Sequence, residues 1–194
     1  EYVDTYFDNL GVQEEINNKL DAMVEDGTLQ ELINAYLQPN TQWTFDTVAD
    51  MKLSTNLVDG SYAKTLGFHS VNDGGAGLYK ISATGTADEM SVIAVGDLYA
   101  TLIYGESVTP EMFGAYGDGT TNDQDYINAA LQSSATVLNF CKGKTYAIKG
   151  YEDGQAQGGS DGLFQTTGIV VPSNRVINLN ECTIKIIPND RQNY

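Results

Sequence analysis

The stretch MFGAYGDGTTNDQDYINAA, residues 112–130, decides how this chain folds. It holds three glycines and three aspartates just ahead of a short apolar stripe. Thr121 or Asn122 is a candidate helix N-cap, and Thr121 stands three residues before Gln124, which is the spacing of a capping box. The pattern therefore predicts a helix over about 122–131 and marks a boundary between two kinds of structure.

The aspartates of this stretch are also candidate metal ligands. A calcium loop of the helix-loop-helix type needs a bidentate glutamate at its twelfth position. Counted from Asp118 that position is Ala129, so the spacing fails. Asp118-Gly119 suits a tight turn, and Asp123 and Asp125 suit the first turn of a helix, where negative charge complements the helix dipole. The sequence favours structural roles over a metal or catalytic site.

Two amphipathic helices are expected in the first 38 residues. One follows the capping residues Asp8-Asn9 and ends at Asp26-Gly27; the second follows a capping-box pattern at Thr28 and Glu31 and stops before Pro39. Short helices gain most of their stability from packing, so both stripes need a partner surface. That surface is either the β region of the same chain or another subunit of an assembly. The stripe residues are Val12, Ile16, Leu20, Met23, Leu29, Leu32, Ile33 and Tyr36.

Strand patterns dominate the rest of the chain. A small, mostly antiparallel β module is expected over 39–108, with a short helix at 45–51 and strands at 62–71, 78–83, 91–95 and 98–104. After the helix near residue 122, short apolar strands are expected at 136–141, 145–149, 168–171, 175–179 and 183–187. Such strands suit the coils of a parallel β-helix or a β-sandwich.

Composition excludes several classes of function. The chain has 10 Lys and Arg against 26 Asp and Glu, a net charge of −16, which repels phosphate backbones and anionic lipid surfaces. We therefore expect neither a nucleic-acid nor a membrane partner. Cys141 and Cys182 stand in apolar, strand-like runs and are interpreted as buried thiols, with a disulfide as the alternative.

No catalytic or cofactor site is marked out. The single histidine, His69, is expected mid-strand in a packing or surface role. The cluster Gly74-Gly75-Ala76-Gly77 lacks the spacing of a dinucleotide or phosphate loop and is interpreted as a turn, so no cofactor is expected. No pair of carboxylates is singled out for glycoside hydrolysis. Trp43, Tyr36 and the tyrosines of 62–104 are candidates for stacking on sugars or partner chains.

The string VTPEMFGAYGDGTTNDQDYINAAL, residues 108–131, resembles the start motif of the pectate-lyase-like, right-handed parallel β-helix domain of tail spikes and appendage proteins of tailed bacteriophages. Residues 168–180, GIVVPSNRVINLN, are similar to the family's first full rung, and residues 60–81 to the small β module that precedes it. Residues 7–37 are similar to the helical anchoring segment of such proteins. The residues matching the start motif are Phe113, Gly114, Gly117, Asp118, Gly119, Asn122 and Asp123.

The resemblance implies a mainly β chain in three parts: a virion-anchoring helical segment over 1–38, the β module over 39–108, and a capping helix with the first rungs of a β-helix over 109–194. It implies a virion structural protein that acts outside the cell, typically as a homotrimer, docked on other tail or collar proteins. Only about two rungs fit after Ala135, and stacked repeats need about three or more, so we expect the protein to continue beyond Tyr194.

Two alternative functions remain open. One alternative is that the full protein is a polysaccharide depolymerase, meaning a glycan hydrolase or lyase, whose active site lies downstream. The other is that it is a bacterial surface adhesin. In the first alternative, residues after this chain contact the host-surface glycan, and residues 1–194 hold no active site.

Overall fold

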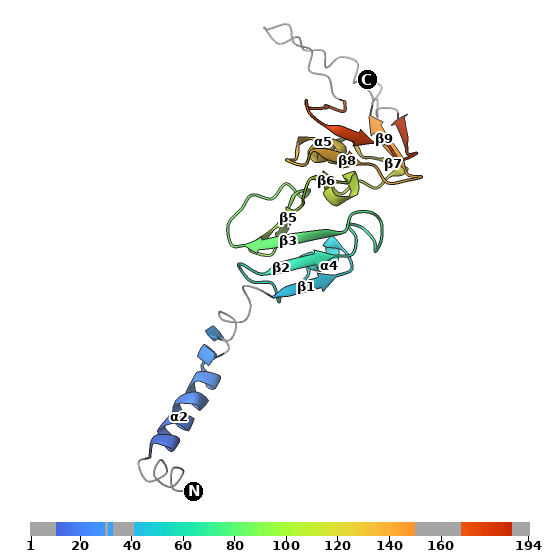
Figure 1. Cartoon of the computed structure of the whole chain (residues 1–194). Helices are drawn as coiled ribbons and strands as arrows, with labels where there is room; N and C mark the ends of the chain where they lie inside the picture. Colours follow the sequence, from blue (N-terminus) through green and yellow to red (C-terminus); the bar gives the residue numbers. More distant parts are fainter. Residues whose placement is uncertain (1–10, 30, 33–40, 150–167, 188–194) are drawn as a thin grey trace, which may run out of the picture. The chain divides into compact units, whose positions relative to one another are not determined.

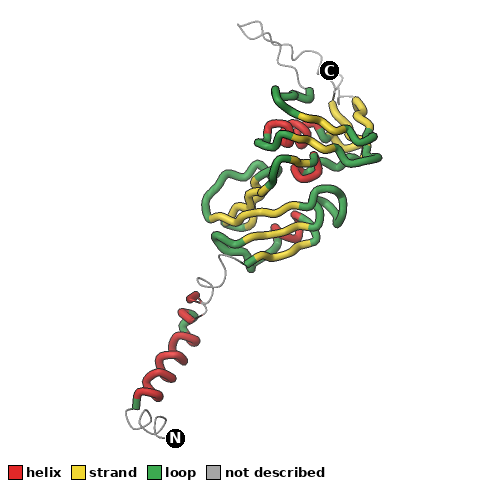
Figure 2. The backbone as a smooth tube through the Cα atoms, in the orientation of Figure 1, coloured by secondary structure: helices red, strands yellow, loops and turns green. Residues whose placement is uncertain are grey.

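A computed structural model of the chain describes residues 11–29, 31–32, 41–149 and 168–187. The chain divides into two compact units, residues 1–41 and 42–194, which are considered separately. Figure 1 colours both units along the sequence, and Figure 2 marks their helices and strands. The expectation of a mainly β chain with a few helices is confirmed.

The first unit contains helix α2, Val12–Glu25. The expected cap at residues 8–9 lies outside the described residues. The helix ends at Asp26, as predicted, and Thr28 is itself helical. The N–H of Thr28 donates to the carboxylate of Asp26 at 2.9 Å, so Asp26, and not Thr28 as predicted, supplies the side-chain acceptor at this point.

The second unit opens with a five-stranded sheet in the order β1-β2-β3-β5-β4. Only the β1–β2 pair is parallel. The strands are β1 Gln42–Phe45, β2 Tyr62–Thr65, β3 Gly77–Ser82, β4 Val92–Val95 and β5 Leu98–Ile103.

Helix α4, Val48–Lys52, packs against this sheet through Val48 and Met51. It begins later than predicted because Phe45 belongs to β1 and Thr47 forms a capping box with Asp50. Phe45 is therefore in a strand and not in the helix.

Strand β2 is much shorter than the predicted 62–71. Asp73 folds the chain back after Thr65: its carboxylate accepts from the N–H groups of Phe68, His69, Ser70 and Gly75 at 2.7 to 3.1 Å. A backbone whose N–H groups point at one carboxylate cannot pair in a ladder. The expectation that His69 lies mid-strand is therefore wrong.

The chain then alternates between two stacks of three parallel strands. The first stack is β6 Ser107–Val108, β8 Val137–Asn139 and β10 Val176–Asn178. The second is β7 Asp118–Asn122, β9 Thr145–Lys149 and β11 Thr183–Ile187. Val108, Leu138 and Ile177 share one register position in the first stack, and Asp118, Thr145 and Thr183 share one in the second.

Sequence patterns located β9 and β11 at their observed bounds and missed β1, β6 and β7. Residues 168–171, predicted as a strand, form none. The missed strands are short or polar: β7 has the sequence DGTTN, which the sequence pattern assigned to a turn and a helix cap.

Helix α5, Gln124–Gln132, follows β7. It starts two residues later than predicted because Asn122 ends β7, and the N-cap position is Asp123. The capping box predicted between Thr121 and Gln124 does not form, since the Thr121 hydroxyl donates to Asp118 at 2.7 Å.

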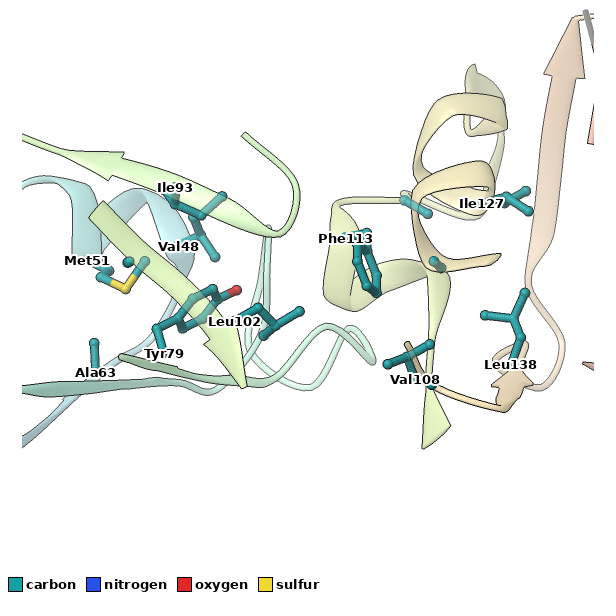
Figure 3. Close-up of a cluster of buried hydrophobic side chains, with 14 of the residues drawn as sticks. Val48, Met51, Ala63, Tyr79, Ile93, Leu102, Val108, Phe113, Ile127 and Leu138 are labelled. Carbon is teal, nitrogen blue, oxygen red and sulfur yellow. The ribbon is translucent and has the colours of Figure 1, made fainter. Parts of the chain in front are cut away.

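One apolar core runs through the second unit from the sheet to the strand stacks. Figure 3 follows it from Ala63 and Tyr79 in the sheet and Met51 in α4, through Leu102 and Val108 to Phe113, and on to Ile127 and Leu138. Every one of these side chains is at most 5% exposed. The sheet and the stacks therefore share one buried core and are not independent layers.

Cys141 and Cys182 are both free and half-buried, and each lies just outside a strand. Within residues 11–29, 31–32, 41–149 and 168–187, no helix is long and apolar enough to cross a membrane.

Candidate functional site

The connection between the sheet and the strand stacks is the most elaborately bonded part of the chain. The segment 109–123, together with the residues that it contacts in 68–75 and 140–147, is called the junction below. The junction begins at Thr109, whose hydroxyl donates to Gly74 O at 2.8 Å and accepts from Met112 N at 3.2 Å. Thr109 thereby caps a short 3-10 helix, η1 Pro110–Phe113.

Phe113 and Gly114 of the start motif form the end of η1 and its cap. Phe113 closes η1 and is buried in the core, and Gly114 has φ 106°, a conformation that disfavours any side chain. A Cβ on Gly114 would stand 3.0 Å from the Tyr126 ring and 3.1 Å from the Phe68 ring. Only glycine fits this position.

His69 fastens the loop of the sheet to this turn. Its Nε2 lies 2.7 Å from Gly114 O, and its ring stacks on Tyr116 with centroids 3.7 Å apart and planes 18° apart. His69 was predicted in a packing or surface role, and it is an exposed residue whose ring packs on Tyr116; its predicted place in a strand is wrong.

Asp123 is fully buried and holds three backbone N–H groups. Its carboxylate accepts from Tyr116 N at 2.7 Å, Gly117 N at 3.2 Å and Ala147 N at 3.3 Å. Burial raises the pKa of Asp123 above its ordinary value, although these N–H groups oppose the rise. Sequence patterns placed Asp123 at a helix start, but they did not find that it bonds the next layer of strands at Ala147.

Asp118 organises the start of β7 and does so at the surface. Its carboxylate accepts from the N–H groups of Thr120 and Thr121, each at 2.7 Å. These two N–H groups hold the pKa of Asp118 far below its usual range. Gly119 next to it has φ 75°, and a Cβ there would stand 3.0 Å from Thr145 in the adjacent strand. The sequence predicted a tight turn at Asp118-Gly119; these residues instead belong to strand β7, whose register against β9 shifts between Asp118 and Asn122.

Asn122 links the same two strands farther along. Its side-chain oxygen accepts from Lys149 N at 3.2 Å, and from Gln124 N at 3.4 Å. Gly117, with φ 61°, lets Lys144 approach closely, because a Cβ there would stand 2.6 Å from the Lys144 side chain. The seven start-motif residues thus lie in one continuous segment, from the end of η1 through β7 to the N-cap of α5, and Asn122 and Asp123 bond this segment to β9.

A second buried group, centred on Glu111, was not predicted. Glu111 is 0% exposed and lies 3.2 Å from Lys144 Nζ; its Oε1 also accepts from the Tyr146 hydroxyl. The Tyr146 oxygen in turn accepts from Cys141 N at 2.9 Å. The sequence signal was a lone glutamate in an otherwise apolar turn, PEMF, which no spacing rule marks.

The side chains of Glu111, Tyr146 and Cys141 are suited to a structural role. Burial, and the neighbouring Glu111 carboxylate, raise the pKa of the Cys141 thiol to about 11, so the thiol stays protonated near neutral pH. Burial also raises the pKa of Tyr146, again with help from Glu111. A protonated thiol and a buried, protonated phenol are poor nucleophiles and poor bases, so the group is suited to holding the junction together.

Polar side chains also tie the third layer of strands to the second. Asn178 Nδ2 donates to Asn139 Oδ1 at 2.7 Å, and these two residues are register partners in β10 and β8. Phe140 N donates to Asn178 O at 2.9 Å, and Asn180 Nδ2 donates to Phe140 O at 3.0 Å. Asparagine therefore bridges the corner between adjacent layers.

The helix stripe predicted to dock is only partly visible. Ile16 is 53% exposed, Leu20 47% and Leu32 53%, while Met23 and Leu29 are half-buried. Ile33, Tyr36 and the side chain of Val12 lie outside the described part of the chain. Among the aromatic candidates, Trp43 packs against the core and Tyr36 is not described.

No group of three or more His, Cys, Asp or Glu side chains within the described ranges is arranged to hold a metal ion. No model of a known protein family matches the sequence. A search of curated proteins also gives no match.

Solved structures with a similar fold include phage tailspikes and a tailspike-like enzyme. WceF of Pantoea stewartii, described as a glycan biofilm modifying enzyme with a bacteriophage tailspike-like parallel β-helix fold, is 19% identical over 61% of this chain and 19% of its own, with a TM-score of 0.47. The gp42 tailspike of Acinetobacter phage vb_AbaP_AS12 is 16% identical over 80% of this chain and 29% of its own, with a TM-score of 0.46.

The gp49 tailspike of Acinetobacter baumannii phage Fri1, described as a capsular polysaccharide depolymerase, is 14% identical over 76% of this chain and 36% of its own, with a TM-score of 0.46. The likeness to all three concerns the fold alone, and this chain spans well under half of each of their lengths.

Proposed function

We propose that this chain is the N-terminal attachment and shaft-initiating part of a phage tail spike or tail fibre used in host adsorption. The observation that carries the proposal is the double stack of parallel strands. The chain passes from β6 to β7, from β8 to β9 and from β10 to β11, and each pass lies in parallel register on the one before. Three such passes support the proposal that the chain starts a right-handed parallel β-helix.

The two ends of this coil stack differ in how they are covered. At the β6–β7 end, η1 and α5 pack on each other and share the core with the sheet. At the β10–β11 end, an apolar hollow of about 310 Å³ is lined by Leu138, Phe140, Ile177 and Ile184, among others. Exposed apolar side chains there include Val176, Leu179 and Ile186. A solenoid with a covered end and an apolar end is one that starts here and accepts a further coil.

Helix α2 supplies the attachment surface in this proposal. Its stripe of Ile16, Leu20 and Val24 is 47 to 60% exposed within its own unit. An apolar stripe of this kind gains stability by packing against a partner, in this case other copies of the helix or a tail or collar protein. A homotrimer is the assembly that we expect.

Immunogold labelling of intact phage particles tests this function. An antibody raised against the folded second unit is expected to place gold at the tail or collar of particles purified from the source. Gold confined to the bacterial surface, with unlabelled particles, would favour the adhesin alternative and contradict the proposal.

Glycan depolymerisation is a separate activity, and no described residue favours it. Among the hollows lined by described residues, those of about 400, 200 and 310 Å³ have one carboxylate between them in their linings, that of Glu89. Both common mechanisms of glycoside hydrolysis need two carboxylates. The 194-residue chain is therefore expected to release no sugar from host polysaccharides, and measurable turnover would contradict the purely structural assignment.

A further inference from the structure

One face of the five-stranded sheet is open. Along each strand the side chains alternate, and those of Ala63, Tyr79, Ile81, Ala100 and Leu102 point into the core. The other set forms cross-strand rows that we call the open face. Its members, grouped by register, are Thr44, Lys64, Leu78 and Ile103; then Gln42, Tyr62, Lys80, Thr101 and Val92; then Ser82, Tyr99 and Ala94.

The charge of the open face is opposite to that of the chain. The five strands contain no aspartate or glutamate, although the whole chain has 26 of them and only 10 Lys and Arg. Lys64 and Lys80 stand on neighbouring strands, and Lys64 is opposite Leu78, two residues before Lys80. Side chains at such diagonal positions are within reach of one anionic group.

These two lysines lack the partners that other lysines have. Lys52 pairs with Glu89 at 2.6 Å, Lys142 with Glu181 at 2.9 Å and Lys144 with Glu111 at 3.2 Å. In the part of the chain that the structure describes, no ion pair or hydrogen bond involves the ammonium group of Lys64 or Lys80. Two neighbouring cations without a counter-ion favour an anionic partner.

Apolar and aromatic groups surround the two charges. Leu78 and Ile103 are directly opposite each other, and Ile103 is 41% exposed. A hollow of about 400 Å³ opens at this edge and is lined by Lys64, Leu78, Ile103 and Met112, among others. Tyrosine and aliphatic side chains with few charges are typical of the centre of a protein–protein interface, and the hollow is large enough to take a partner's side chain.

From this combination we infer that the open face is an interface with a second copy of the chain, whose carboxylates bind Lys64 and Lys80. Each copy carries a net charge of −16, so two copies repel each other across most of their surfaces. The open face lowers that repulsion, because its strands have no carboxylate and it carries two cations and an apolar row. A neighbouring copy, with 26 Asp and Glu, supplies carboxylates that complement the two lysines, and such a contact joins two different surfaces, as in a ring of subunits.

Sedimentation equilibrium of the 194-residue chain tests this inference. The wild type is expected to self-associate, and the double variant Lys64→Glu/Lys80→Glu to weaken association by about tenfold or more, because it places carboxylates against carboxylates. Lys64→Gln/Lys80→Gln, which removes only the charges, should have a smaller effect in the same direction. Raising the salt concentration should narrow the difference in association between the wild type and the double Gln variant, because salt screens the two lysine charges that distinguish them.

Matched variants separate the open face from other surfaces. Lys142 is an exposed lysine outside the sheet. Lys142→Glu makes the same change of charge as each substitution in Lys64→Glu/Lys80→Glu, and it should leave association unchanged. Ile16→Glu/Leu20→Glu tests the α2 stripe on its own, so a failure of the attachment proposal is distinguishable from a failure of this one. Circular dichroism spectra that match the wild type establish that each variant is folded.

Three outcomes would overturn the inference. A wild-type chain that stays monomeric at all concentrations has no such interface. An association that is insensitive to both double lysine variants uses another surface. Binding of an acidic polysaccharide such as polygalacturonate, lost in Lys64→Glu/Lys80→Glu while the chain remains a monomer, would assign the face to a glycan and not to a second copy.

Discussion

Asp123 and Ala147 are joined by a reciprocal pair of backbone and side-chain hydrogen bonds across two successive coils. Asp123 N donates to Ala147 O at 2.7 Å, and Ala147 N donates to the Asp123 carboxylate at 3.3 Å. The same carboxylate holds Tyr116 N and Gly117 N. One buried side chain therefore fixes the turn before β7, the start of α5 and the position of β9.

Replacing Asp123 by alanine should destabilise the second unit by about 2 to 4 kcal/mol, because three N–H groups, one buried and two partly buried, lose their acceptor. Asp123→Asn should also destabilise, since an amide NH₂ would face N–H donors. Urea unfolding followed by tryptophan fluorescence measures both. The matched control is Asp125→Ala, an exposed acid in the first turn of α5, with an expected cost of about 0.5 kcal/mol. Equal costs at the two positions would show that Asp123 does not join the coils.

The buried ion pair of the junction should matter more than an exposed one. Lys144→Ala leaves the buried Glu111 carboxylate without its cation, and we expect a loss of about 1 to 2 kcal/mol, reduced because Lys144 is 24% exposed to water. Lys142→Ala breaks the surface pair with Glu181 and should cost less than about 0.5 kcal/mol. The measurement is again urea unfolding, and the claim fails if the two losses are alike.

Asp73 should make the stability of the sheet depend on pH. Burial alone would raise the pKa of Asp73, but the N–H groups of Ser70, Gly75, His69 and Phe68 outweigh it and hold the pKa below its ordinary value. Because the folded pKa lies below the unfolded one, the contribution is present above about pH 4 and is lost as the pH falls through the folded pKa.

Asp73→Asn should therefore be less stable than the wild type at pH 7, and the difference between the two should shrink as the pH is lowered from about 4 toward 2. Urea unfolding at a series of pH values measures this difference. The control Asp97→Asn removes a carboxylate from an exposed turn. A difference between Asp73→Asn and the wild type that does not vary with pH would contradict the role given to Asp73.

Cys141 should react slowly with alkylating reagents in the folded protein. With a pKa of about 11, roughly one thiol in a thousand is ionised at pH 8, against about a quarter for an ordinary cysteine. Mass spectrometry after iodoacetamide treatment should show Cys141 alkylated at least about a hundredfold more slowly in the native than in the urea-unfolded chain. Glu111→Gln should speed the native reaction, because the carboxylate that opposes ionisation is gone; an unchanged rate would remove Glu111 from the group.

The sequence predicted the periodic elements well and the polar ones poorly. Strands β9 and β11 have apolar runs and were located at their observed bounds. Strand β7 is DGTTN, and it is a strand only because Asn122 and Asp123 bond to the next coil, a contact between residues about 25 positions apart. Tertiary contacts of this kind leave no local pattern.

In the candidate site, too, some residues were predicted from the sequence and others were not. Phe113, Gly114, Gly117 and Gly119 were marked by a family resemblance, and their positive φ angles and close approaches give the physical reason for glycine at three of them. Glu111, Lys144 and Tyr146 were not found, because they are far apart in the sequence and meet only when β9 lies beside β7. His69 was predicted in a packing or surface role, which it has, but its predicted strand was wrong because Asp73 turns the backbone away from β2.

The measurement that tests the central claim most directly is an electron cryo-microscopy reconstruction of the intact tail of the source phage. We expect density for the second unit on a tail appendage, with a further coil stacked in parallel register on β10 and β11 and density for helix α2 in contact with a virion protein or with its own copies. A tail without this protein, or an antiparallel strand closing the β10 or β11 edge, would contradict the proposal that this chain starts the β-helical shaft of a spike or fibre.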